Sequence, residues 1–198
     1  MFLAPAMSTP RFPEAWHKLS DELLLSRGGE GILEVRGDSM RPTLRAGRSV
    51  RVAFRAGAPH LGDLVVFRQV DYLAVHRYLG PTRGPDGATR LRTRGDGVPK
   101  FDPAVEPERV LGRVVALERP DGWWSAQGRG ARGYAIALAI HALCWTTLGA
   151  WAGRIDAALG TRVAAGLARL DAALLRAVDA IGFRALHARV APPPPVIL

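Results

Sequence analysis

The sequence predicts a mainly β core, arranged as an antiparallel sheet, followed by a C-terminal α-helical appendage that is partly hydrophobic and partly amphipathic. Two observations lead to this fold class. Short runs of β-branched and apolar residues recur between residues 31 and 118, separated by clusters of Gly, Pro and Asp. This spacing is typical of antiparallel barrels and sandwiches and argues against a βαβ fold. Beyond residue 132, apolar residues recur at helical intervals instead. The 198 residues, 48% of them hydrophobic, suffice for one ordinary domain with an appendage.

The N-terminal segment, residues 1–30, has apolar residues at roughly helical spacing over residues 13–26, and we expect a short helix there. The β-rich region, residues 31–118, contains six candidate strands, at residues 32–35, 49–54, 63–68, 72–77, 90–93 and 110–117. Turns are expected between them, including one at Gly80 and Pro81. Residues 119–132 are rich in Gly, polar and charged residues, and are expected to form a linker.

The first helical segment, residues 133–153, contains no Lys, Arg, Asp or Glu. Its length fits a membrane span, which needs about 20 apolar residues. Trp145 and Trp151 lie toward its end, where tryptophan would suit a membrane interface. We therefore expect a hydrophobic, transmembrane-type helix here.

The second helical segment, residues 154–190, is amphipathic, with a break expected at Gly160 or Gly166. Its apolar residues recur every three or four positions, and its arginines share another face. This helix either packs on the hydrophobic segment or a partner, or lies on an anionic membrane surface. A proline-rich tail, residues 191–198, ends the chain.

Composition restricts the classes of function. The single cysteine, Cys144, rules out a disulfide within the chain and any cysteine-based metal cluster, and we expect no metal or cofactor. The formal net charge is +9, and 25 of the 27 basic residues are arginine. These arginines are scattered and do not form a block, so no nucleic-acid partner is expected. The first residues are too short and too interrupted by proline for an export signal or membrane anchor.

A serine-centred motif carries the chemistry: residues 37–44 read GDSMRPTL. The hydroxyl of Ser39 needs a base that accepts its proton, either a neutral lysine or a histidine oriented by a carboxylate. No lysine occurs between Ser39 and Lys100, and among five histidines only His76 lies in a candidate strand of this region. His60 follows Pro59 in an expected turn. The sequence therefore favours a Ser–His pair, and Asp96 and Asp102 supply the nearby carboxylates.

These motifs resemble those of the type I signal peptidases and their relatives among the self-cleaving repressors. Residues 37–44 resemble the serine box, residues 62–67 the strand motif that follows it, and residues 75–77 (VHR) the base-bearing segment. Residues 93–96 (TRGD) with Asp102 resemble the last box. The histidine base is similar to that of the endoplasmic-reticulum, archaeal and sporulation-type enzymes. Four boxes occur in order across about 70 residues.

The resemblance implies a serine endopeptidase with Ser39 as nucleophile, His76 as general base and Asp102 as the acid that orients the histidine. Asp96 would be a supporting carboxylate. The resemblance also implies an all-β core that binds an extended peptide or preprotein by strand addition and accepts small residues next to the cut. The oxyanion donor would be the main-chain N–H of Ser39.

Three further residues of the serine box have expected roles. Asp38 would shape the serine turn, while Met40 and Pro42 would position the serine or line the substrate groove. The last box departs from the histidine-type enzymes because it lacks their paired asparagines next to Gly97.

The expected location is a membrane, such as a bacterial inner membrane, with the side occupied by Ser39 left open. Arginines flank residues 133–153 at both ends, so the positive-inside rule does not orient this segment. Two other functions remain open: a catalytically degenerate peptidase fold that interacts with membranes, and a self-cleaving regulator. The second would need a DNA-binding domain, for which residues 1–30 are too short, and a lysine base.

Overall fold

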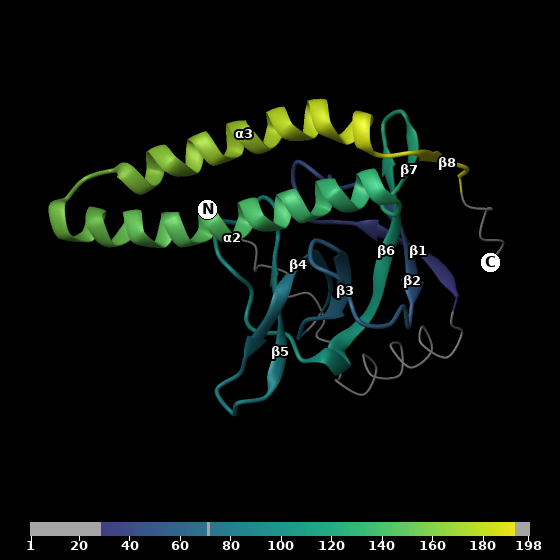
Figure 1. Cartoon of the computed structure of the whole chain (residues 1–198), viewed down its shortest axis with the longest axis horizontal. Helices are drawn as coiled ribbons and strands as arrows, with labels where there is room; N and C mark the ends of the chain where they lie inside the picture. Colours follow the sequence, from purple (N-terminus) through teal and green to yellow (C-terminus); the bar gives the residue numbers. More distant parts are fainter. Residues whose placement is uncertain (1–28, 71, 193–198) are drawn as a thin grey trace, which may run out of the picture.

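The chain forms an antiparallel sheet of eight strands followed by two C-terminal helices (Figure 1). A computed structural model describes residues 29–70 and 72–192. The main sheet has the strand order β1-β2-β6-β3-β4-β5, and β7 and β8 extend it beyond β6. The strands are β1 (Glu30–Val35), β2 (Arg48–Phe54), β3 (Leu64–Arg68), β4 (Leu73–Arg83), β5 (Thr89–Arg94), β6 (Val110–Arg119), β7 (Gly122–Ser125) and β8 (Arg189–Val190). A 3₁₀ turn, η1 (Pro107–Arg109), precedes β6.

All six strands expected from the sequence are present; five lie within two residues of their expected ends, and β4 runs six residues further, to Arg83. The turn expected at Gly80 and Pro81 is wrong, because β4 continues through both residues to Arg83. The strand continues because Gly80 adopts a φ of +102°, and the β4–β5 register shifts between Tyr78 and Pro81. Such an irregularity lets a strand carry a proline.

The linker expected at residues 119–132 contains structure that the sequence did not reveal. Residues 122–125 form β7, which pairs with the end of β6 and then with β8. Burial of Trp124 explains this pairing, since the indole packs into the core and its Nε1–H donates to Asp121. The helix expected from residue 133 already begins at Arg129. The helix expected at residues 13–26 and most of the proline-rich tail lie outside the described residues.

The main hydrophobic core lies between the curled sheet and the two helices. Its largest members include Met40 and Leu44 of the serine box, Trp124 of β7 and Phe183 of the last helix. Burying each large apolar side chain contributes about 1.5–3 kcal/mol. The serine box is therefore anchored in the same core that holds the helices to the sheet.

The helices α2 (Arg129–Leu159) and α3 (Val163–Leu186) form an antiparallel hairpin. The break expected at Gly160 is confirmed: Gly160 has a left-handed φ of +65° and ends α2. The carboxylate of Asp156 accepts bonds from the N–H groups of Val163 and Ala164, which begin α3. The helices α2 and α3 are therefore separate elements joined by a hydrogen-bonded turn, and they do not form one continuous helix.

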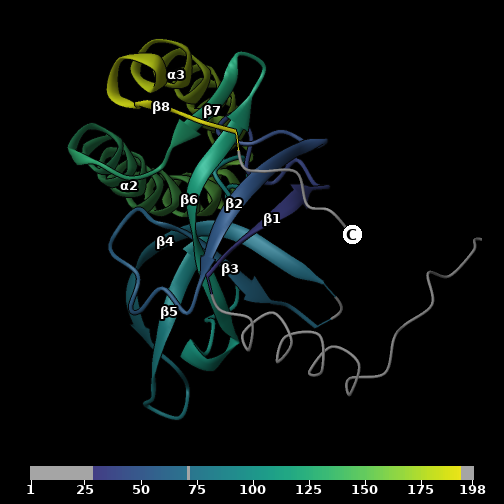
Figure 2. The same ribbon diagram turned by 90° about the vertical axis from the view of Figure 1, so that its right-hand side faces the viewer.

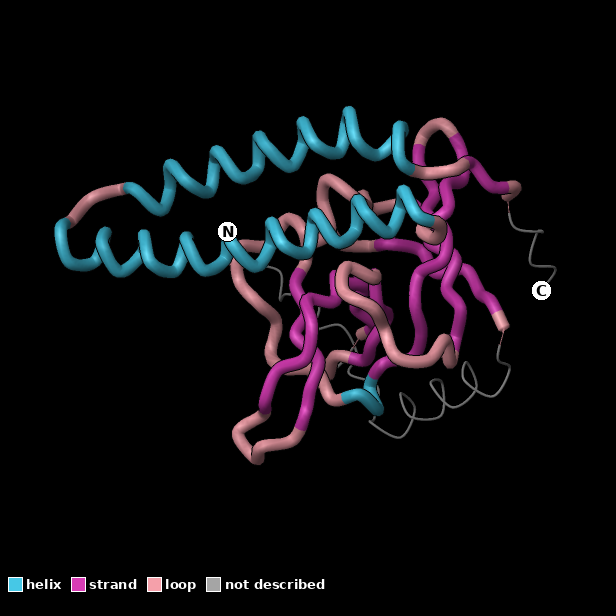
Figure 3. The backbone as a smooth tube through the Cα atoms, in the orientation of Figure 1, coloured by secondary structure: helices cyan, strands magenta, loops and turns pink. Residues whose placement is uncertain are grey.

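The hairpin lies along one face of the sheet, and its closed end projects beyond it (Figures 1 and 3). In α2, the residues buried against the body are concentrated in the first half: Ala131, Tyr134, Leu138, Ala139 and Ala142. In α3, Leu175 and Phe183 of the second half are buried. The view along the hairpin shows α2 and α3 side by side above the strands (Figure 2).

Candidate active site

The serine loop, residues 37–44, leads from β1 to β2 as a series of tight turns. The Arg41 N–H donates to the Asp38 carbonyl at 3.1 Å, and the Leu44 N–H donates to the Met40 carbonyl at 2.9 Å. The Arg41–Pro42 peptide bond is cis. Because Met40 and Leu44 are 2% and 1% exposed, the apolar members of the loop fix it to the core, and Ser39 between them and the solvent is half-buried.

The structure brings Ser39, His76 and Asp102 into one chain of hydrogen bonds. The Ser39 Oγ lies 3.0 Å from His76 Nε2, and His76 Nδ1 lies 2.7 Å from Asp102 Oδ2. With the Nδ1 N–H donating to the Asp102 carboxylate oxygen, Nε2 is left to accept the serine proton. Ser39, His76 and Asp102 come from three separate parts of the fold: the serine loop, β4 and the segment after β5.

Asp102 is held by Thr93, a fully buried residue of β5. The Thr93 hydroxyl donates to Asp102 Oδ2 at 2.7 Å, and the Asp102 N–H donates to the Thr93 carbonyl at 3.0 Å. Phe67 packs its ring edge against His76, with the ring centroids 5.9 Å apart. These contacts fix both the acid and the imidazole plane, so the alignment does not depend on the His76–Asp102 bond alone.

Asp96 has a different place from Asp102. Its carboxylate accepts two bonds from Arg77, at 2.7 and 2.6 Å, and one from the Thr43 hydroxyl at 2.5 Å. Burial alone would lower the pKa of Arg77, but attraction to Asp96 and their hydrogen bonds raise it above its ordinary value. Arg77 Nη1 also donates to the Gly62 carbonyl at 2.8 Å. Asp96 is thus a structural carboxylate under the serine loop, and Asp102 is the carboxylate that meets the histidine.

Two glycines of the last box let its turn approach the serine loop closely. The Gly97 N–H donates to the Ser39 carbonyl at 2.8 Å. A Cβ atom on Gly95 would lie 2.5 Å from the same carbonyl oxygen, and one on Gly97 would lie 2.9 Å from the Arg41 carbonyl oxygen. Only glycine fits such a backbone contact, which explains the Gly-Asp-Gly sequence at residues 95–97.

A groove of about 910 Å³ passes over Ser39 and His76. One wall is formed by β1 and the start of the serine loop, and the other by the first residues of β4. Among the described strands, β1 pairs only with β2, and β5 pairs with β4 only from Arg77 onward. Each wall therefore has a strand edge that could pair with an extended peptide. The lining is mainly apolar, with Leu33, Val35, Leu73, Val75 and Met40 among its members.

The remaining members of the serine box lie as follows. Met40 lines the groove and also packs into the core beneath the serine. Pro42 lies outside the groove and lines a second cavity, of about 450 Å³, between the serine loop and α3. Asp38 lines that cavity too, and its exposed carboxylate accepts a 2.7 Å bond from Arg41 Nε. Asp38 thus bridges the turn around Ser39.

The helical hairpin contacts the region of the site through two arginines, the buried Arg94 and the half-buried Arg119. Arg94, next to Gly95, donates from Nη1 to the Ala142 carbonyl at 2.8 Å and to the Thr146 hydroxyl at 2.6 Å. Its Nε donates to the Val98 carbonyl in the loop of the last box. Burial lowers the pKa of Arg94, while Asp171 of α3, 3.7 Å away, opposes that shift.

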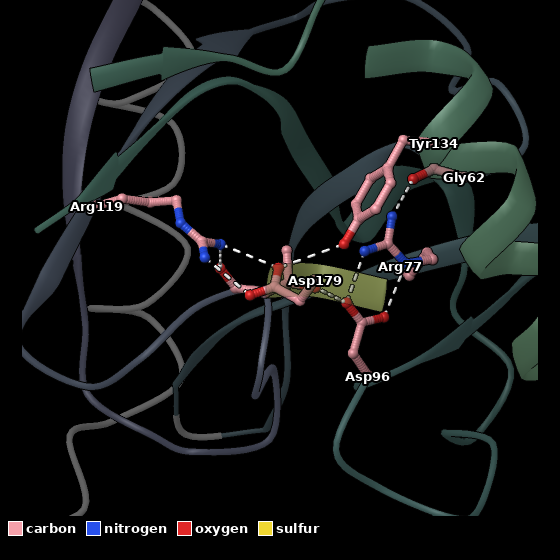
Figure 4. A network of polar contacts seen from close by, with 7 residues as sticks. Gly62, Arg77, Asp96, Arg119, Tyr134 and Asp179 are labelled. Carbon is pink, nitrogen blue, oxygen red and sulfur yellow. Dashed lines mark hydrogen bonds and ion pairs between the residues drawn. The ribbon is translucent and has the colours of Figure 1, made fainter. Parts of the chain in front are cut away.

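Arg119, at the end of β6, makes the second connection (Figure 4). Its guanidinium donates to both carboxylate oxygens of Asp179 at 3.0 and 2.8 Å and lies 4.0 Å from the centre of the Phe183 ring. The Tyr134 hydroxyl donates to the same Asp179 carboxylate at 3.3 Å, and burial raises the pKa of Tyr134. Both helices are therefore joined to the sheet beside the serine loop.

The residues that sequence reasoning did not single out are those that hold the triad and the loop: Thr93, Thr43, Arg77, Arg94 and Gly95. Arg77 directly follows His76, and Thr43 lies within the serine motif. Their closeness in sequence to the predicted site residues was the one feature that could have indicated their supporting role. Within the described part of the chain, no three His, Cys, Asp or Glu residues are grouped to hold a metal ion. No protein-family model and no curated protein matches this sequence.

Proposed function

We propose that this chain is a serine endopeptidase of the signal-peptidase type, with an acyl-enzyme mechanism. The observation that carries the proposal is the continuous Ser39–His76–Asp102 hydrogen-bond chain at the base of an apolar groove. A structural histidine would not need a serine on one ring nitrogen and a braced carboxylate on the other. The motif resemblance to signal peptidases supports the same conclusion independently of the geometry.

The reaction would proceed in two halves. In the first, Nε2 of His76 accepts the Ser39 proton while Oγ attacks the peptide carbonyl, and the imidazolium then protonates the leaving amine. In the second, His76 removes a proton from the water that attacks the acyl carbonyl. The imidazolium then returns this proton to Ser39 Oγ as the ester bond breaks and the carboxylate product leaves. Asp102 holds the imidazole in the required tautomer and stabilises its charged form.

The Ser39 N–H is the proposed oxyanion donor. Among the described residues, the Ser39 N–H donates no backbone hydrogen bond, whereas the Arg41 N–H donates to the Asp38 carbonyl. The Gly97–Ser39 bond and the close packing of Gly95 fix the peptide unit that follows Ser39 and, with it, the local backbone. A preorganised donor of this kind typically contributes a factor of about 10²–10³ in kcat.

The proposed substrate is an extended peptide segment that adds as a strand along β1 or β4. Main-chain bonds along either free edge would supply affinity, and alternate side chains would enter the apolar groove. Leu33, Val75 and Met40 line the same groove as Ser39, and the preference for small residues next to the cut rests on the motif resemblance. A membrane location is part of the proposal, because signal-peptidase substrates are membrane-inserted and α2 is long and apolar enough for a membrane span by length and composition.

The test is cleavage of a peptide library by the purified full chain, read by mass spectrometry, with intact-mass detection of the acyl-enzyme. Ser39→Ala and His76→Asn are expected to abolish both the products and the mass adduct. His60→Asn is the matched control, since His60 is an exposed turn histidine paired with Asp63. Cleavage by Ser39→Ala at the wild-type rate would overturn the proposal. Full folding of the wild type with no cleavage and no adduct would favour the degenerate membrane-interaction scaffold.

A further inference from the structure

The outward side of α3 carries an aliphatic stripe that the fold leaves uncovered. We call Val163, Leu170, Leu174 and Val178 the outer stripe; intervals of seven, four and four residues place them on one helix face. They are 43%, 57%, 41% and 37% exposed. The face that α3 turns to the body instead carries Asp171, Leu175, Asp179 and Phe183. Leu175 and Phe183 enter the core, whereas the four residues of the outer stripe do not.

The closed end of the hairpin has the same character. We call residues 147–170 the tip. Leu148, Trp151 and Leu159 of α2 are 39%, 59% and 72% exposed there. A tryptophan beside aliphatic residues is typical of a surface that meets the membrane interface. The tip projects beyond the sheet, so the catalytic body does not block its approach to a flat surface (Figure 1).

The tip carries a net positive charge. It contains Arg154, Arg162 and Arg169 and a single acid, Asp156. Asp156 is fully occupied in capping α3 and bonding Thr161, and these bonds lower its pKa. Within the described chain, none of the three arginine side chains has an ion-pair or hydrogen-bond partner. The surface is thus apolar and cationic together, which complements an anionic lipid bilayer.

The first half of α2 packs against the rest of the protein and is therefore not available to contact lipid. Tyr134, Leu138 and Ala142 are buried against the body, and Arg94 bonds Ala142 and Thr146 near the middle of the helix. Only residues 147–159 remain beyond that point. Thirteen helical residues extend about 20 Å, short of the roughly 30 Å hydrocarbon core of a bilayer. With the hairpin docked in this way, α2 does not reach across a membrane.

From these observations we propose that the hairpin is an in-plane membrane anchor: the tip and the outer stripe lie in the headgroup region of an anionic bilayer without crossing it. This inference does not depend on catalysis by Ser39. The apolar residues enter the acyl boundary and the arginines stay at the level of the lipid phosphates. The anchor would hold the peptidase groove beside the membrane surface.

Vesicle flotation of the full-length chain tests the lipid preference, using phosphatidylcholine vesicles with and without phosphatidylglycerol. Binding is expected only to the anionic vesicles and is expected to weaken with salt. Leu170→Glu and Trp151→Glu should each reduce binding at least tenfold, and Arg162→Gln by about fivefold. Val70→Glu is the matched control: Val70 is 76% exposed but lies on the turn after β3. It should bind like the wild type.

Ser39→Ala should also bind like the wild type, which separates anchoring from activity. Equal binding to neutral and anionic vesicles, or unchanged binding by Leu170→Glu, would overturn the proposal. A wild type that ignores vesicles but forms a dimer lost in Leu170→Glu would assign the stripe to self-association instead.

Sidedness distinguishes an in-plane anchor from a span. In a Cys144→Ser background, Gln127→Cys and Thr161→Cys place one thiol at each end of α2. In sealed membrane vesicles, an impermeant thiol reagent should reach both positions from the same side. Labelling of the two positions from opposite sides would show a span and reject the in-plane arrangement.

Discussion

The guanidinium of Arg77 and the carboxylate of Asp96 form a buried ion pair with two parallel bonds of 2.7 and 2.6 Å, directly beneath the serine loop. Their side chains are 3% and 4% exposed. Arg77 adjoins the proposed base, and Asp96 bonds Thr43 of the serine box. Arg77 also donates to the carbonyl of Gly62, the first residue of the strand motif, so the pair joins all four motifs at one point in space.

Removing one partner of this pair should strongly destabilise the fold. Asp96→Asn leaves a buried guanidinium without its counter-charge, and such a loss typically costs about 3–5 kcal/mol. The free energy of unfolding from urea titration measures the effect. Asp38→Asn breaks the 59%-exposed pair with Arg41 and serves as control, with an expected cost below about 1 kcal/mol. Equal costs for the two variants would contradict the structural role given to Asp96.

Asp102→Asn should disable catalysis while leaving the fold intact. The amide would present an N–H or a weaker acceptor to Nδ1, which disfavours the tautomer that accepts the serine proton. The expected loss in kcat is on the order of 10⁴, with little change in KM. Steady-state kinetics and a thermal melt measure the two properties. Thr93→Val, which removes one bond to the same carboxylate, should produce a smaller loss in kcat.

Gly95→Ala should abolish the proposed peptidase activity through the backbone. The added Cβ would lie 2.5 Å from the Ser39 carbonyl oxygen, so the serine loop must move away from His76. Gly133→Ala is the control, because no atom lies within 4 Å of its Cβ position and the residue is helical. The control should gain up to about 1 kcal/mol of stability and keep full activity. An active Gly95→Ala enzyme would show that the loop contact is not required.

Arg94→Lys should loosen the serine loop from the helical hairpin. Lysine keeps the charge but cannot donate at once to Val98, Ala142 and Thr146 as the guanidinium does. Faster hydrogen exchange is expected at the Gly97 N–H, which bonds the Ser39 carbonyl, together with a lower kcat. Arg92→Lys is a control on the same strand. No change in Gly97 exchange would mean that the hairpin does not brace the site.

Stability should fall on acidification through His187. This residue is buried, with its ring stacked on Phe183 at 3.9 Å and its Nδ1 at 3.0 Å from the Phe183 carbonyl. Burial lowers its pKa below the ordinary 6.5, with Arg119 and Arg77 acting in the same direction. The unfolded chain therefore binds the proton more readily, so this contribution is complete above about pH 6.5 and is lost as pH falls.

Urea titrations between about pH 7.5 and pH 5.5 measure that slope. His187→Phe keeps a stacked ring without a titrating group and should flatten the slope, whereas the exposed-site variant His60→Asn should not. An unchanged slope in His187→Phe would remove His187 as its source.

The proposed roles of Ser39 and His76 could be inferred from the sequence, because both residues lie in short motifs whose residue types indicate the chemistry. The lack of lysine between Ser39 and Lys100 restricted the base to histidine, and His76 was the only histidine in a candidate strand. The six central strands followed from alternation and turn residues, and the hairpin break was expected at Gly160 or Gly166 and lies at Gly160. These features depend on neighbours along the chain, so they could be predicted without coordinates.

Other features were decided by contacts between distant residues. The choice between Asp96 and Asp102 needed the fold, since both follow β5 and only the packing aims Asp102 at His76 and Asp96 at Arg77. The strand β7 forms because Trp124 finds a core to enter, and β4 passes Gly80 because its partner strand shifts register.

By itself, the sequence determined the residue types of the site, the antiparallel β character of the core and the presence of an apolar and an amphipathic helix. The tertiary structure alone decided which acid meets the histidine, which glycines touch the serine loop, and which face of α3 is left uncovered. The physical reason is the range of the interactions. Periodicity and turn chemistry act over a few residues, whereas burial and the pairing of charges depend on surfaces that the folded chain brings together.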